Sequence, residues 1–372
     1  MLIVRTPVRI SFAGGGSDFP SYYEKFGGMV LSTSIDKYFY TVLTEREDRQ
    51  TQIISSDLKT LESCEQVEKM EFQGRDLEIP FAVLKHLRCD VGVNLFLASE
   101  VPPGTGLGSS AAVCVNILKT LSVFLGHDLS VEELAETAFH IARNILKKPV
   151  GKQDEYAVAF GGLNVLQFFA HGVEVERLRL PEELLLDLEQ NLMLFFTGSS
   201  RDSSEILQEQ DRSIRQLQDV VVDAVAMLKR LVLPMRDALL GSDLDAFAGL
   251  LDEGWKIKKR ISSKISNSRI DQIYEVAKSR GALGGKITGA GGGGFLLLYC
   301  ERENQAKVRE GLKEFGLKEM TFHFDQGGAR VVYDDPFFDS DSRRGMHWIF
   351  TPTLGGVPRQ AEAFDIPPRN PG

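Results

Sequence analysis

The segment from Val101 to Ala112, VPPGTGLGSSAA, constrains the fold of this chain most strongly. It places three alternating glycines directly before two serines and an apolar run. Glycine adopts positive φ angles at little cost and lets main-chain N–H groups approach a bulky anion. A helix that begins near Ser109 would add its unpaired N–H groups and its dipole at the same point. The segment predicts a polyphosphate-binding loop, and the alternative is a glycine-rich turn before a serine-capped helix.

Two further glycine-rich segments lie near the ends of the chain. Arg5 to Asp18 runs from a strand pattern into three consecutive glycines, and Gly284 to Cys300 places a glycine loop between two apolar segments. Part of the second loop matches the spacing of a dinucleotide-binding fingerprint, which requires a strand before it and a helix after it. Phe295 to Cys300 instead has the pattern of a buried strand. We therefore expect this loop to join two strands.

Length and composition limit the class of protein. The 372 residues are enough for two domains, and 43% hydrophobic and 26% charged residues are typical of a globular protein. A net charge of −9 argues against general binding to nucleic acid or to anionic membranes. The N-terminal stretch carries Arg5 and Arg9 and does not resemble a signal peptide. The four cysteines are scattered, which favours reduced thiols and a cytoplasmic location.

The pattern along the chain predicts an α+β protein, because strands and helices do not alternate strictly. Val131 to Leu146 is predicted to be a helix that begins with a capping box at Ser130 and Glu133. Ser203 to Leu240 reads as one long helical stretch. Further strands are expected at 3–12, 29–34, 38–43, 92–99, 163–169, 173–180, 192–196, 283–288, 295–300 and 318–324, and further helices at 80–87, 243–260, 267–280 and 305–315. The residues after 335 lack periodicity and read as a loosely ordered tail.

Three motifs together resemble the GHMP kinase superfamily. They run from Pro7 to Asp18, from Pro102 to Ala111 and from Lys286 to Gly294, in the order and spacing of that family. The resemblance implies a two-domain α+β fold with the active site in the cleft between the domains, and ATP and Mg²⁺ as cofactors. It divides the chain into an ATP-binding domain at 1–185, a C-terminal domain at 186–335 and a tail at 336–372.

Within that family the chain is most similar to kinases that phosphorylate the anomeric hydroxyl of a sugar, and especially to D-glycero-D-manno-heptose 7-phosphate kinases. Four segments carry this similarity: 13–28, 149–162, 196–207 and 281–295. It implies that the acceptor is the 7-phosphate and the product the 1,7-bisphosphate. A free-sugar kinase acting on fucose, galactose or a uronic acid stays open, as does a catalytically silent sensor of sugar and ATP with the same fold.

The resemblance also assigns roles to two charged residues. Asp154 matches the catalytic aspartate, which would orient the acceptor hydroxyl and accept its proton. The alternative for Asp154 is a helix N-cap. Arg9 matches a basic position of the first motif and would stabilise developing negative charge. The alternative for Arg9 is a charge on the surface of a strand.

The same resemblance implies how the nucleotide and the metal are held. Ser110 matches a serine that contacts Mg²⁺, while many relatives place a metal-binding glutamate where this chain has Ala142 and Arg143. Glu155 or another acid would then have to substitute, or the metal would depend on the nucleotide. The residues expected to bind ATP are Pro103, Gly104, Gly106, Leu107, Gly108, Ser109, Ser110 and Ala111.

The substrate-binding residues are expected to come from all three glycine-rich segments. Asp18 resembles a position that binds sugar hydroxyls, although an Asx-turn residue is the alternative. Lys152, Arg201 and Lys286 are candidates for holding a phosphate already on the sugar, or else are ordinary solvated charges. The full set of expected substrate contacts is Gly15, Gly16, Ser17, Asp18, Lys152, Arg201, Gly289, Ala290, Gly291 and Gly292. The expected partner is a small sugar or sugar phosphate, and the sequence leaves open whether the chain forms a homodimer.

Overall fold

A long antiparallel pair of strands forms the centre of the structure. In the computed structural model, which describes residues 1–127, 129–198 and 204–335, β1 (Leu2–Ala13) pairs with β2 (Gly28–Glu45) along nearly its whole length. Residues Met1–Asp334 make one compact unit. The predicted tail at 336–372 lies outside the described residues.

The first sheet is built around this pair. Its strand order is β12-β1-β2-β5-β3-β4, and β6 pairs with β2 and with β7. The partners are β3 (Thr51–Ser55), β4 (Thr60–Cys64), β5 (Val93–Ser99), β6 (Leu163–Phe169), β7 (Gly172–Arg177) and β12 (Arg330–Asp334). All pairs are antiparallel except β3 with β5. The last strand of the described chain thus returns to the first.

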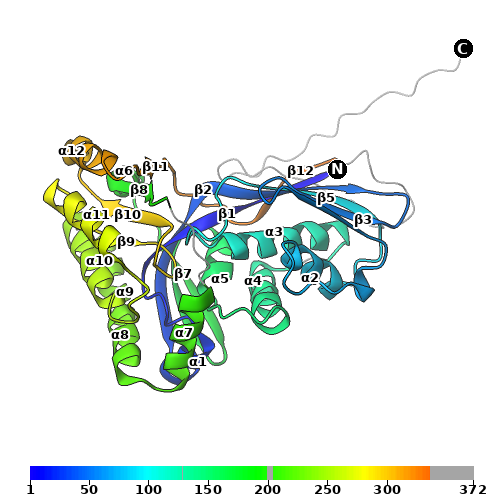
Figure 1. The fold of residues 1–372 in the computed structure, drawn as a ribbon, viewed down its shortest axis with the longest axis horizontal. Helices are drawn as coiled ribbons and strands as arrows, with labels where there is room; N and C mark the ends of the chain where they lie inside the picture. Colours follow the sequence, from blue (N-terminus) through cyan, green and yellow to red (C-terminus); the bar gives the residue numbers. More distant parts are fainter. Residues whose placement is uncertain (128, 199–203, 336–372) are drawn as a thin grey trace, which may run out of the picture. The chain divides into compact units, whose positions relative to one another are not determined.

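Helices cover one face of this sheet (Figure 1). They are α2 (Glu78–His86), α3 (Ser109–Phe124), α4 (Val131–His140) and α5 (Gln153–Phe160). The α3 helix lies directly against β1 and β2 and buries most of its side chains. Its buried Asn116 donates to the carbonyl oxygens of Val4 and Phe39 at 3.2 and 3.1 Å. These bonds tie the helix to both central strands.

A second, four-stranded sheet has the order β11-β8-β10-β9, with all pairs antiparallel. Its strands are β8 (Leu192–Phe196), β9 (Gly284–Ile287), β10 (Phe295–Tyr299) and β11 (Lys318–Glu319). The helices of this region are α6 (Glu182–Asn191), α8 (Asp219–Arg230), α9 (Val232–Leu240), α10 (Leu244–Lys258), α11 (Ser268–Ser279) and α12 (Arg302–Lys313). The rings of Phe12 and Phe247 meet edge to face at 5.2 Å, which joins β1 to α10 in one core.

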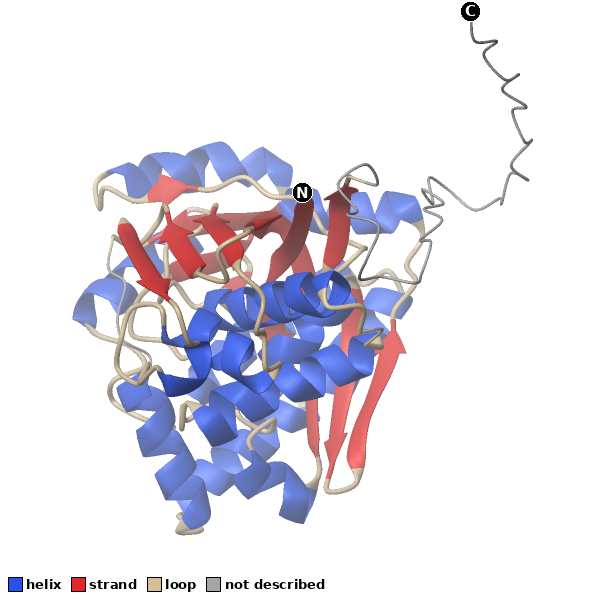
Figure 2. Ribbon diagram, turned by 90° about the vertical axis from the view of Figure 1, so that its right-hand side faces the viewer, coloured by secondary structure: helices blue, strands red, loops and turns tan. Residues whose placement is uncertain are grey.

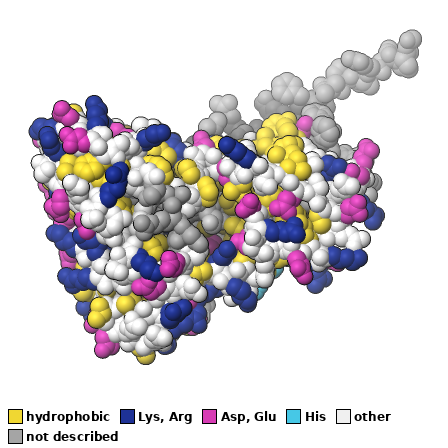
Figure 3. Space-filling view, in the orientation of Figure 1, with side chains coloured by type: hydrophobic (Ala, Val, Ile, Leu, Met, Phe, Trp, Pro, Cys, Tyr) yellow, Lys and Arg dark blue, Asp and Glu magenta, His cyan; other side chains and the backbone are white. Residues whose placement is uncertain are grey.

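The mixture of strands and helices confirms the predicted α+β class (Figure 2). The capping box at Ser130 and Glu133 is also confirmed, since both of its hydrogen bonds are present. The helix that it starts ends in a π-helical turn, η2 (Ile141–Ile145), which the sequence did not indicate. On the face shown in Figure 3, acidic and basic side chains are interspersed.

Several predicted elements were wrong. The single helix expected from Ser203 to Leu240 is three helices, α7 (Ser204–Arg215), α8 and α9. The break between α7 and α8 lies at Leu217, which adopts a left-handed φ of 52°. Of the strand expected at 318–324, only the first two residues form β11. The prediction also missed α1 (Pro20–Phe26), α6, the β3–β4 hairpin and β12.

Candidate active site

The segment Val101 to Ala112 forms a loop that ends in the predicted helix. Gly104, Gly106 and Gly108 have φ angles of 71°, 80° and 74°, and α3 begins at Ser109. The N-cap residue, Gly108, has no side chain that could satisfy the first N–H groups of the helix. Leu107 is fully buried and anchors the loop. The loop therefore presents open N–H groups at a helix N-terminus, which is the geometry that binds phosphate.

Arg9 and Asp154 meet beside this loop. The Nε and Nη2 atoms of Arg9 donate to the two carboxylate oxygens of Asp154 at 2.8 and 2.5 Å, and Nη1 donates to the carbonyl oxygen of Gly106 at 2.6 Å. The guanidinium is almost fully buried, whereas 28% of the Asp154 side chain is exposed. Arg9 is thus no surface charge, and Asp154 lies inside α5 and does not cap it. The accessible end of the pair is the carboxylate.

The main chain of β1 also holds the phosphate-binding loop. The N–H of Arg9 donates to the carbonyl oxygen of Leu107 at 2.9 Å, and on its other side Arg9 pairs with Ser34 of β2. The strand that carries the guanidinium therefore fixes the loop as well.

The second glycine-rich loop, between β9 and β10, packs against the first. As predicted, it joins two strands and is not followed by a helix. A Cβ atom on Gly106 would lie 2.5 Å from the carbonyl oxygen of Thr288, and one on Gly289 would lie 2.5 Å from the Cα atom of Gly106. The N–H of Phe295 donates to the carbonyl oxygen of Thr105 at 3.2 Å. Glycine is needed here because two backbones approach each other directly.

The rest of this loop packs on the segment that follows α10. The N–H of Gly292 donates to the carbonyl oxygen of Ile265 at 2.7 Å, and a Cβ on Gly291 would lie 2.9 Å from the same oxygen. Ala290 is half-buried beside them. The expected sugar contacts of these residues stay a prediction.

Lys258, at the end of α10, is a charged residue of the site that the sequence analysis missed. Its buried Nζ donates to the carbonyl oxygen of Gly289. The pKa of the Lys258 ammonium is lowered to about 8, mainly by burial and also by the nearby guanidinium of Arg9, while Asp18 and Asp154 act in the opposite direction. The lysine therefore places a second positive charge behind the pair of glycine-rich loops.

Lys286 does not serve as an accessible phosphate ligand. Its Nζ donates to the carbonyl oxygens of Ser11 and Phe12 at 2.8 and 3.1 Å, in the protein interior. Burial lowers the pKa of this ammonium well below its usual value. The expectation that Lys286 holds a substrate phosphate was wrong, because both of its observed partners are main-chain oxygens of β1.

A third glycine-rich loop, from Gly14 to Asp18, lies next to Asp154. The Asp18 carboxylate accepts hydrogen bonds from the N–H groups of Gly16 at 2.9 Å and Gln153 at 3.2 Å. Burial raises the pKa of the Asp18 carboxyl to about 6, and the negative charge of Asp154 raises it as well. Ser17 is fully buried, and its hydroxyl bonds to main-chain groups of Gly14 and Met29. In this conformation both side chains hold the loop together.

A cavity of about 280 Å³ adjoins the pair. It is lined by Ser110 and Ala111 at the start of α3, by Gly104 and by Asp154. Glu155 also lines it, but burial and the charge of Asp154 raise the pKa of the Glu155 carboxyl well above its usual value.

The described residues suit a metal held mainly by nucleotide. Among them, no group of three or more His, Cys, Asp or Glu could hold an ion. Mg²⁺ is usually bound through one or two carboxylates together with substrate phosphates and water. The Ser110 hydroxyl and the Asp154 carboxylate, on the wall of the same cavity, fit that mode. At the positions of the missing glutamate, Ala142 lines this cavity, whereas Arg143 lines a different one.

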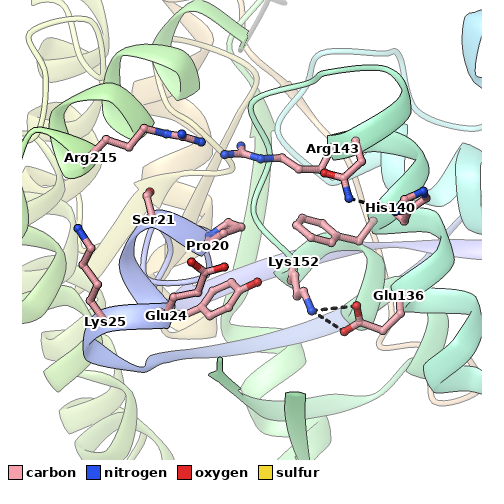
Figure 4. Close-up of a pocket in the computed structure, with 12 residues that line it drawn as sticks. Pro20, Ser21, Glu24, Lys25, Glu136, His140, Arg143, Lys152 and Arg215 are labelled. Atoms are coloured by element: carbon pink, nitrogen blue, oxygen red, sulfur yellow. Dashed lines mark hydrogen bonds and ion pairs between the residues drawn. The ribbon is translucent and has the colours of Figure 1, made fainter. Parts of the chain in front are cut away.

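Lys152 belongs to that other cavity, which we call the basic cavity and define by Lys25, Arg143, Lys152 and Arg215 (Figure 4). The Lys152 ammonium donates to both carboxylate oxygens of Glu136 at 2.6 and 2.8 Å. This ammonium is therefore paired and is no solvated charge. Arg201, the other predicted phosphate ligand, lies outside the described residues.

Comparisons with known proteins match these features. Models of the GHMP kinase N-terminal domain and of the GHMP kinase C-terminal region match residues 78–162 and 235–318. A D-glycero-alpha-D-manno-heptose 7-phosphate kinase of Campylobacter jejuni is 31% identical over 334 residues, which is 88% of this chain and 97% of that protein. The chain belongs to the GHMP kinases. This GHMP kinase is an ATP-dependent phosphotransferase that acts on a sugar hydroxyl.

Two further proteins are similar to this kinase. The crystal structure of a D-glycero-D-manno-heptose 1-phosphate kinase from Bacteroides thetaiotaomicron superposes with a TM-score of 0.76 at 27% identity, over 90% of this kinase and all of that chain. A bifunctional fucokinase/GDP-fucose pyrophosphorylase of Arabidopsis thaliana is 24% identical over 328 residues. The match covers 84% of this kinase and 31% of that protein. The two matched family segments lie within the predicted domains 1–185 and 186–335, whose boundaries stay a prediction. None of the described helices is long and apolar enough to cross a bilayer.

Proposed function

We propose that this GHMP kinase transfers the γ-phosphoryl group of ATP to the anomeric hydroxyl of D-glycero-D-manno-heptose 7-phosphate, giving the 1,7-bisphosphate and ADP. The observation that carries the proposal is the Arg9–Asp154 pair, whose exposed carboxylate lines the same cavity as Ser110 and Ala111 at the start of α3. The names of the two similar heptose kinases also contain a heptose phosphate, although they place the phosphate differently.

In this proposal the carboxylate of Asp154 accepts the proton of the anomeric hydroxyl while the oxygen attacks the γ-phosphorus. Arg9 fixes the orientation of the carboxylate by its two parallel hydrogen bonds. The N–H groups at the start of α3 bind the phosphate chain. Mg²⁺, when bound with ATP, neutralises charge on the transferred group.

The first test replaces the general base. Asp154→Asn keeps the size of the side chain but removes the proton acceptor, so we expect kcat to fall by about 10²–10⁴-fold. Asp219→Asn is the matched control, because Asp219 also lies in the first turn of a helix but is exposed in α8. ADP release is measured for both variants. Equal rates for the two variants would contradict the assigned role of Asp154.

The second test concerns the acceptor. ATP consumption is measured with heptose 7-phosphate, the unphosphorylated heptose, fucose, galactose and glucuronic acid, and the phosphorylated carbon is identified by NMR. We expect the highest kcat/KM for heptose 7-phosphate. A higher value for an unphosphorylated sugar would overturn the substrate assignment, and the absence of turnover with every sugar would favour a sensor.

A further inference from the structure

The basic cavity has a volume of about 540 Å³ and is lined by several positive side chains. Four cations line it in a protein whose net charge is −9. They come from three separate parts of the chain: Lys25 from α1, Arg143 and Lys152 from the segment around η2 and α5, and Arg215 from α7. Figure 4 shows the guanidinium groups of Arg143 and Arg215 pointing toward one another.

Part of this positive charge is already balanced. The carboxylate of Glu136 forms an ion pair with the Lys152 ammonium. One oxygen of Asp211 accepts hydrogen bonds from both Arg143 at 2.8 Å and Arg215 at 3.2 Å. Two guanidinium groups thus share one carboxylate. An arginine carries five N–H donors, so most donors of the two arginines stay open for another acceptor.

Lys25 and Arg215 are the most accessible cations of the cavity. Arg215 is 60% exposed on its side chain, and within the described residues the Lys25 ammonium has no ion pair. The remaining acidic group of the lining is Glu24. The cavity therefore keeps an excess of positive charge at its open side, which suits a phosphate monoester bound by arginine forks and a lysine.

The basic cavity and the cavity at Asp154 are lined by residues that neighbour each other in the sequence. Ala142 lines one and Arg143 lines the other, and Lys152 precedes Asp154 by two residues. The N–H of Lys152 donates to the carbonyl oxygen of Asp18 at 3.1 Å, two residues before α1 begins. Arg143 also donates to the carbonyl oxygen of Val150 at 3.2 Å, within the same loop.

Ala142 and Arg143, which line the two different cavities, both lie in the π-helical turn η2. In η2 the N–H of Leu146 bonds to the carbonyl oxygen of Ile141, five residues earlier. Such a turn adds a residue to the helix and is frequent at functional sites. It contains Ala142 and Arg143, the two positions at which the family resemblance would place a metal-binding glutamate.

We propose that the basic cavity binds the phosphate that the acceptor sugar already carries, with Arg143, Arg215 and Lys25 as its ligands. This inference rests on the proposed function, since it takes the anomeric oxygen to lie at Asp154. The sugar then extends from Asp154 along the loop at residues 149–153, and its phosphate lies between α1, η2 and α7. The site selects for a sugar phosphate over the free sugar.

The test uses Lys25→Gln, Arg215→Gln and the double variant of the full-length protein. These side chains are exposed, so the variants are expected to fold, which circular dichroism checks. We expect the ratio of kcat/KM for heptose 7-phosphate to kcat/KM for the free heptose to fall about tenfold in each single variant. Glu24→Gln removes a negative charge from the same wall and should raise the ratio. Lys313→Gln, an exposed lysine of α12, is the matched control.

A binding measurement makes the result independent of turnover. Inorganic phosphate is titrated into the ATP-free protein by calorimetry, and the double variant should bind at least about tenfold more weakly than the wild type and the Lys313→Gln control. Equal phosphate binding by the double variant and the wild type would overturn the proposed subsite. The proposed function fails separately, when the wild type consumes no ATP with heptose 7-phosphate.

Discussion

The close contact between the two glycine-rich loops leads to a prediction about Gly106. Replacing Gly106 by alanine has two costs. The residue has a φ of 80°, which costs an L-amino acid about 1 kcal/mol. The new Cβ would also lie 2.5 Å from the carbonyl oxygen of Thr288, a main-chain atom that cannot rotate away. Overpacking of this kind costs about 1–3 kcal/mol.

Gly126→Ala is a matched control for this substitution. Gly126 has a φ of 76°, but a Cβ there would meet no atom within 4 Å. Gly126→Ala should therefore lower the free energy of unfolding by about 1 kcal/mol, and Gly106→Ala by about 2–4 kcal/mol. Urea titration followed by circular dichroism measures both values.

The two variants should also differ in activity. Moving the loop at Gly106 changes the positions of the N–H groups that bind phosphate, so we expect kcat/KM for ATP to fall at least about tenfold, which corresponds to about 1.4 kcal/mol. Gly126 lies beyond the far end of α3, and its variant should keep the wild-type value. Equal stability losses in the two variants, with equal kcat/KM, would refute the view that the loops need direct backbone contact.

Two further predictions concern buried charges of the site. Lys258→Met should lower kcat. It should also remove an alkaline limb near pH 8 from the wild-type pH–rate profile, because the ammonium near Arg9, Asp18 and Asp154 loses its proton at that pH. An alkaline limb that persists in the variant would refute this prediction. The folded-state pKa of Asp18, about 6, lies above its unfolded value of 3.8. The folded state therefore binds more protons between these two pH values. The free energy of unfolding should fall by roughly 3 kcal/mol as the pH rises through this window. Unfolding of Asp18→Asn from pH 4 to 7 should lack that part of the slope, and an unchanged slope would contradict it.

The sequence predicted the glycine-rich loops and the pair that they adjoin because their chemistry is local or follows a fixed motif. Positive φ angles at Gly104 and Gly106 follow from the residue type, and the capping box at Ser130 depends on residues three positions apart. The approach of Arg9 to Asp154 spans 145 positions, and only the resemblance to a family indicated it.

Other parts of the site depend on tertiary contacts that leave no local pattern. Lys258 is one of 43 lysines and arginines, and only packing against the Gly289 loop makes it part of the site. Lys286 carries the same charge and is likewise buried, but it holds the main chain of β1. The break at Leu217 has no glycine or proline to mark it, although the residue has a left-handed φ of 52°.

The hydrogen bond from the N–H of Arg9 to Leu107 has a consequence for motion in the catalytic cycle. One strand position carries both the guanidinium that orients the base and the anchor of the nucleotide loop, so the spacing between these two elements cannot change without breaking the hydrogen bond from Arg9 to Leu107. The guanidinium of Arg9 and the nucleotide loop should therefore keep a fixed spacing through the catalytic cycle.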